Sequence, residues 1–165
     1  MGVQPGGAVH TVRTTRGSRP VRALRSPASM AFGMFGVMME TVIAVFLGGG
    51  LGAVARHFVN TGVMQIWHRD FPLGILVINI LGSFLMGVLI STFAHVWDTP
   101  QNVRAFLTVG ILGGFTTFSS FSLDTIMLFE RGQYIQAAIY LFASVGISLL
   151  ALILGMWLVR MGVKL

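Results

Sequence analysis

The stretch that decides the fold is GILGGFTTFSSFSLD, residues 110–124. It lies in an uncharged run, residues 105–123, that is long enough to enter a lipid bilayer. Its middle nevertheless makes a poor apolar helix, because Gly113 and Gly114 are followed by five hydroxyl side chains within residues 116–122. Glycine permits backbone conformations that break a helix. We therefore expect a transmembrane segment broken near residues 113–117.

Two interpretations of this break are open at the level of sequence. Non-helical backbone survives at membrane depth only where protein or a polar cavity covers it, and broken helices in transporters use it to bind ions. Alternatively, residues rich in Gly, Ser and Thr allow two membrane helices to pack closely. The stretch alone does not choose between an ion site and a helix contact.

The composition places the whole chain in a membrane. Of its 165 residues 55% are hydrophobic, the mean hydropathy is +0.82, and only 10% are charged. Soluble domains carry about 25% charged residues, so we expect an integral membrane protein. The absence of cysteine excludes disulfides, thiolate nucleophiles and cysteine-ligated metals.

The basic excess is confined to the beginning of the chain. Five of the eleven basic residues precede Met30, where there is no acid, whereas six basic residues and five acids follow residue 37. A nucleic-acid partner is not expected, because that needs a basic patch on a folded face. We expect residues 1–36 to be disordered. They are either a transit peptide or, as we favour, a non-native extension translated upstream of a start near Met38.

We expect four spans within a channel domain, residues 37–165, at about 40–61, 72–94, 103–130 and 134–160. In the first span only residues 41–55 are uncharged, and about 20 residues are needed to cross, so Arg56 must lie within the helix near one end. Arg56 either snorkels to the headgroups or lines a polar vestibule. Four glycines between residues 48 and 52 suit a close helix contact.

Two polar stripes follow helical spacing in otherwise apolar spans. Each has residues four apart, and these are Asn79, Ser83 and Gly87 in the second span and Tyr140, Ser144 and Ser148 in the fourth. Such a stripe either bonds one helix to another or lines a pathway.

The deep polar groups are nearly all neutral hydrogen-bond donors, with Asp124 as the single acid and no lysine. A cation path would favour acids or converging carbonyls, whereas hydroxyl and amide donors suit a small, hard anion. Phe118 and Phe121 are three residues apart and either turn their positive ring edges towards one site or fill the core. A proton-coupled small multidrug exporter, the alternative, would need an acid within the first span, where Glu40 lies only at the edge. Enzyme activity is not expected, since no nucleophile–base pair is recognisable.

At these residues the chain resembles the fluoride-channel family of small four-span membrane proteins, Fluc/CrcB. Three blocks carry the resemblance, namely GGGLGAVARH at 48–57, PLGILVINILGSFLMG at 72–87 and GILGGFTTFSSFSLD at 110–124. It extends over about residues 37–160. The family often has Glu where this chain has Asp124, so the charge is kept.

The resemblance implies an all-α, dual-topology antiparallel homodimer in the cell inner (plasma) membrane that exports fluoride passively and gives fluoride resistance. It implies ring-edge contacts to fluoride from Phe118 and Phe121, with Asn79 as a pore donor. It also implies a structural Na⁺, not transported, on the backbone carbonyls of Gly113 and Thr116. The complete candidate pathway is Asn79, Phe118, Phe121, Ser120, Tyr140, Ser144, Ser148 and Arg56.

Overall fold

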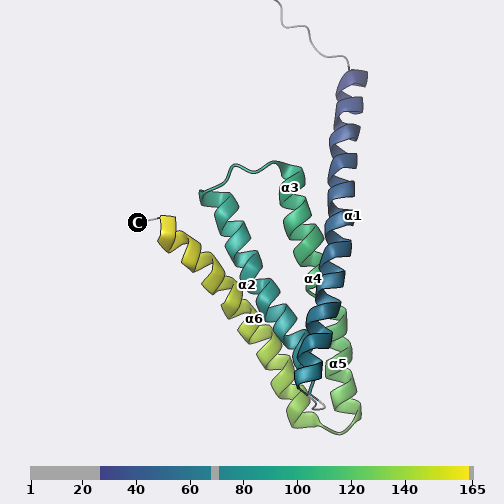
Figure 1. Ribbon diagram of the computed structural model, residues 1–165, viewed down its shortest axis with the longest axis vertical. Coiled ribbons are helices and arrows are strands. Elements are labelled where there is room, and N and C mark those ends of the chain that lie inside the picture. The colour runs from purple at the N-terminus through teal and green to yellow at the C-terminus, as the bar shows by residue number, and fades with distance from the viewer. Residues whose placement is uncertain (1–26, 68–70, 164–165) are drawn as a thin grey trace, which may run out of the picture.

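The protein is an all-helical membrane protein in the part that the computed structural model describes, residues 27–67 and 71–163. Four segments are long and apolar enough to cross a membrane. They are α1 (Pro27–Ile66), α2 (Leu73–His95), a composite third span covering residues 101–130, and α6 (Tyr134–Val163) (Figure 1). The predicted four-span architecture is therefore confirmed.

Helix α1 is longer than the sequence led us to expect. Its 40 residues correspond to about 60 Å, roughly twice the apolar thickness of a bilayer, and it projects beyond the other helices in Figure 1. The helix includes residues 27–36, for which the sequence predicts disorder, and Pro27 occupies its first position. Residues 1–26, and residues 68–70 in the loop before α2, lie outside the described part.

The third span is a succession of short helices. It contains α3 (Gln101–Ala105), the π-helix η1 (Phe106–Leu112), α4 (Gly113–Phe115) and α5 (Phe118–Glu130). The backbone leaves the helix at Thr116 (φ −76°, ψ 156°) and Thr117 (φ −152°, ψ 119°). Gly113 is helical, with φ −66° and ψ −36°. The predicted break is present, but the two threonines form it and the glycines before it do not.

The glycines instead allow α1 to approach the third span. A Cβ atom on Gly114 would lie 2.5 Å from the carbonyl oxygen of Gly49, and one on Gly48 would lie 2.6 Å from that of Phe106. Such contacts are too short for any side chain, so the two backbones touch only because glycine is present. The helix contact is therefore confirmed for the glycines and the break lies at the threonines, while the ion site stays a prediction.

Helices α2 and α6 are locked together in a similar way. A Cβ atom on Gly87 would collide with the backbone of Leu152, and one on Gly155 with the backbone of Phe84. The Ser91 hydroxyl adds a hydrogen bond of 3.2 Å to a backbone carbonyl of α6. This contact brings the polar stripes of the second and fourth spans onto a common cavity.

Candidate functional site

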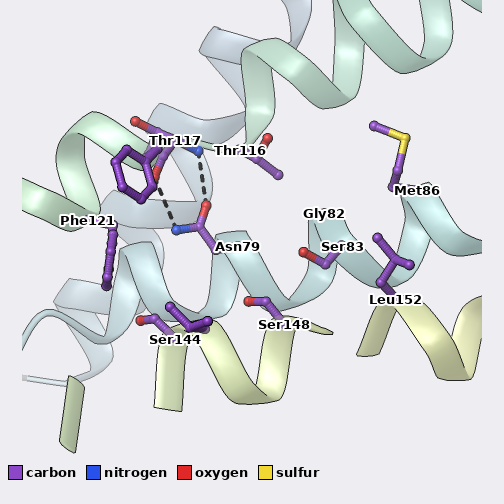
Figure 2. Close-up of a pocket in the computed structure, with 12 residues that line it drawn as sticks. Asn79, Gly82, Ser83, Met86, Thr116, Thr117, Phe121, Ser144, Ser148 and Leu152 are labelled. Carbon is purple, nitrogen blue, oxygen red and sulfur yellow. Dashed lines mark hydrogen bonds between the residues drawn. The ribbon is translucent and has the colours of Figure 1, made fainter. Parts of the chain in front are cut away.

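A cavity of about 300 Å³ lies between α2, α6 and the break in the third span (Figure 2). Its polar lining consists of one amide and five hydroxyl side chains, contributed by Asn79, Ser83, Thr116, Thr117, Ser144 and Ser148. The rest of the wall is apolar, and the lining contains no Asp, Glu, Lys or Arg among the described residues. The cavity therefore offers hydrogen bonds without a fixed charge.

The structure brings most of the predicted pathway residues together here. Five of the eight line the cavity, namely Asn79, Phe118, Phe121, Ser144 and Ser148. Ser83 and Thr117 also line it, although neither is among the eight predicted pathway residues. The signal for Ser83 is its position one helical turn from Asn79, on the same face of α2.

Asn79 forms hydrogen bonds with the backbone at the break. Its Nδ2 donates to the carbonyl of Thr117 at 3.1 Å, and its Oδ1 accepts from the N–H of Thr117 at 3.0 Å, as the dashed lines in Figure 2 show. These bonds satisfy both backbone polar groups of a residue that has left the helix, across 38 positions of sequence. One Nδ2 hydrogen is used in this way, so the role of Asn79 as a fluoride donor stays a prediction for the other.

The side chain of Thr117 starts the second half of the span. Its Oγ1 accepts from the N–H of Ser120 at 3.3 Å, which makes Thr117 the N-cap of α5. The same oxygen lies 3.2 Å from the hydroxyls of Ser119 and Ser120. Ser120 is thus placed beside the break and does not belong to the lining of the cavity.

Two hydroxyls of α6 are buried without a hydrogen bond of good geometry in the described structure. Ser144 is only 4% exposed, and neither its Oγ nor that of Ser148 makes such a bond, although the Ser144 hydroxyl lies near that of Tyr140. An unsatisfied buried polar group is unfavourable by about 1–3 kcal/mol, so such groups are normally retained where something else binds them. Both residues line the cavity.

Aromatic rings run from the cavity towards the start of α2. The ring centroids of Phe118 and Phe121, of Phe121 and Tyr140, and of Tyr140 and Phe71 are each 5.6 Å apart. Phe121 is 6% exposed, whereas Phe118 is 78% exposed. The two phenylalanines predicted to act as a pair therefore have different surroundings in a single chain.

Tyr140 lies behind Phe121 and is not part of the cavity lining. It is fully buried, and its hydroxyl donates to Oδ2 of Asp124 at 3.2 Å. Asp124 also lines a second cavity, of about 250 Å³, together with Phe71 and Arg131. The carboxylate of Asp124 is thus a hydrogen-bond acceptor for the tyrosine.

The remaining predicted residues lie outside the first cavity or at its edge. Arg56 is partly buried on α1 and does not line this cavity. Thr116 lines it, and Gly113 is exposed three residues earlier. No cluster of His, Cys, Asp or Glu suited to a metal occurs among the described residues, so a cation here would need backbone or hydroxyl oxygens.

Comparison with known proteins matches almost the whole helical region. A family model described as CrcB-like protein, Camphor Resistance (CrcB), matches residues 43–156, which include every residue that lines the first cavity. A fluoride-specific ion channel FluC from Granulibacter bethesdensis is 52% identical over 122 residues, which are 74% of this chain and 96% of that relative. Similar values hold for FluC of Rhodospirillum centenum (48% over 125 residues; 76% and 99%) and FluC 1 of Nitrobacter hamburgensis (50% over 119; 72% and 94%).

Proposed function

This chain belongs to the CrcB-like protein family, and we propose that it is a fluoride-specific ion channel that lets fluoride leave the cytoplasm down its electrochemical gradient. It is a membrane transport protein and not an enzyme. The observation that carries the proposal is the cavity itself, where the Ser144 and Ser148 hydroxyls are buried without a hydrogen bond of good geometry and no charged side chain contributes to the lining.

The chemistry of the cavity suits a small anion. Hydroxyl groups donate hydrogen bonds to an anion that has shed its water, and the edge of a phenylalanine ring carries partial positive charge. Conduction also requires that binding be weak enough for the ion to leave, which neutral donors allow and a fixed positive charge would oppose. A proton-coupled exporter is not favoured, because the lining offers no carboxylate to carry the proton.

Anion efflux from liposomes tests this function. Purified protein is reconstituted, and the release of fluoride and of chloride is recorded with ion-selective electrodes. We expect rapid fluoride release and no chloride release above that of empty liposomes. Ser144→Ala should slow fluoride release, because it removes one of these two hydroxyl donors. Equal rates for the two halides would contradict the proposal.

We further propose that two copies form an antiparallel homodimer with two pores. Support comes from the surface beside the break, where Ser119 is exposed and the backbone of Thr116 and Thr117 is not helical although all three lie within a membrane span. Hydroxyls and irregular backbone facing lipid are unfavourable, and a second copy would cover them. A monomeric mass for the purified protein in detergent, measured by light scattering, would count against this assembly.

The protein is a multi-pass membrane protein, and we propose that it resides in the cell inner (plasma) membrane, where export would lower cytoplasmic fluoride and give resistance. We also propose a structural Na⁺ on the backbone carbonyls of Gly113 and Thr116. The residues present fit such an ion, because hard cations prefer oxygen ligands and these carbonyls lie at the break and in the helical turn before it. When bound, the ion would supply positive charge that stabilises carbonyls buried between two copies.

A further inference from the structure

Two N–H groups at the break are diverted from the carbonyls that they would bond in a continuous helix. In an α-helix each N–H donates to the carbonyl four residues earlier, so Thr117 would bond Gly113 and Ser120 would bond Thr116. Instead the N–H of Thr117 donates to Oδ1 of Asn79, and the N–H of Ser120 donates to Oγ1 of Thr117. Side chains have therefore taken the helical donors of both carbonyls.

These are the two carbonyls proposed above as sodium ligands. A backbone carbonyl without a donor at membrane depth needs another partner, because there is no water in the hydrocarbon to supply one. A bound cation is such a partner. The break therefore leaves the carbonyls of Gly113 and Thr116, like the others of the last helical turn, without helical donors, and the choice of these two as ligands rests on the family resemblance.

We propose that Asn79 and Thr117 are positioning residues of the cation site, which hold two N–H groups away from the carbonyls of Gly113 and Thr116. This inference rests on the proposed sodium site. The amide of Asn79 is fixed at both ends, since its Oδ1 accepts from Thr117 while its Nδ2 donates to the carbonyl of the same residue. Because Asn79 also lines the first cavity, one side chain joins the cavity wall to the cation site.

The test uses four variants of the full chain. Asn79→Leu removes both hydrogen bonds to Thr117, and Thr117→Val removes the cap on Ser120 with little change of shape. Thr117→Ser keeps the hydroxyl and serves as the rescue. Ser83→Ala is the matched control, because Ser83 lines the same cavity one turn from Asn79 and makes no side-chain hydrogen bond to the break in the described structure.

The readout is the thermal unfolding of the purified protein as Na⁺ replaces N-methyl-D-glucamine at constant ionic strength. Each of these two substitutions frees one N–H group, which can then donate to the carbonyl that it would bond in a continuous helix. Na⁺ must compete with that hydrogen bond for the carbonyl oxygen. We expect Asn79→Leu and Thr117→Val each to raise the Na⁺ concentration at half-maximal stabilisation by about five- to tenfold. Thr117→Ser and Ser83→Ala should stay within about twofold of the unmodified chain, as no N–H is released.

Each possible result either supports or contradicts the positioning role of Asn79 and Thr117. If the unmodified chain is stabilised by Na⁺ and all four variants show the same midpoint, Asn79 and Thr117 do not position the site, although the site itself stands. If Na⁺ does not stabilise the unmodified chain, the sodium site is wrong and this inference falls with it, while fluoride efflux still judges the channel function. If Asn79→Leu does not fold, Thr117→Val against Thr117→Ser carries the same comparison.

Discussion

Tyr140 donates a hydrogen bond of 3.2 Å to Asp124, and this bond holds the tyrosine ring against Phe121 at the end of the first cavity. The tyrosine is fully buried, so no water can replace its partner. Its ring lies between Phe121 and Phe71, each 5.6 Å away between centroids. Asp124 therefore fixes the tyrosine that supports one of the two phenylalanines of the proposed pathway.

Removing the Tyr140 hydroxyl should loosen this support. We expect Tyr140→Phe to lower the free energy of unfolding by about 1–3 kcal/mol, because it leaves the carboxyl of Asp124 without its donor. Asp124→Glu and Asp124→Asn keep an acceptor and should be milder. Thermal unfolding and fluoride efflux would be measured on all three proteins. A Tyr140→Phe protein as stable as the unmodified chain would show that the bond is not important for stability.

The two phenylalanines should respond differently in stability and alike in transport. Isoleucine fills similar space but has no positive ring edge, so Phe118→Ile and Phe121→Ile should each abolish fluoride efflux. Phe121 is 6% exposed and packed against Tyr140, so its replacement should also destabilise the protein by about 1–3 kcal/mol. If both variants transport fluoride as fast as the unmodified chain, the two rings serve only to fill the core.

The contact between α1 and the third span should tolerate no added methyl group. In Gly114→Ala the new Cβ would lie 2.5 Å from the carbonyl oxygen of Gly49, so we expect destabilisation by about 1–3 kcal/mol. Gly50→Ala is the control, because no atom lies within 4 Å of its Cβ position. Melting temperatures of the two variants would be compared in one detergent, and equal values would contradict the close approach.

Removing Na⁺ should lower the stability of the protein, because the proposed ligands belong to the main chain. Because the proposed ligands are backbone carbonyls, Thr116→Ser should retain the response to Na⁺, whereas complete removal of Na⁺ should lower both the melting temperature and fluoride transport. The hydroxyl of Thr116 bonds the carbonyl of Leu112 at 2.8 Å, and serine can repeat this bond. A chain whose stability and transport are unaffected when all sodium is removed would exclude the structural ion.

A form of the chain that begins at Met38 should insert into the membrane in both orientations. Lys and Arg near the span ends set orientation, and acids contribute little. One side carries Arg104, Arg160 and Lys164, and the other carries Arg69, Arg131 and, if it reaches the interface, Arg56. Three against three gives no bias, so a C-terminal reporter should be detected on both sides of the membrane.

The full chain supplies the contrast for this experiment. Its additional residues contain five arginines and no acid before Met30, which should fix the termini inside and suppress dual insertion. Comparing the two forms therefore also tests whether the N-terminal segment is part of the working protein. A single orientation of the short form would refute the antiparallel dimer.

Local pattern in the sequence was sufficient for the spans and for the polar residues they carry. Uncharged length predicted four crossings, and the spacing of Ser144 and Ser148 predicted one polar face on the fourth. Length and helical period depend on neighbours within a few residues, so they can be read along the chain. The position of the break was predicted to within a few residues for the same reason.

Tertiary contacts decided what individual residues do. The glycines of the third span became helix contacts because α1 lies against them, and Thr117 could leave the helix because Asn79, 38 residues earlier, satisfies its backbone. Phe118 and Phe121 look equivalent in the sequence, yet only Phe121 has Tyr140 to pack on. A buried polar or aromatic group is stabilised by the partner that meets it in space, and the residues next to it in the chain do not specify that partner.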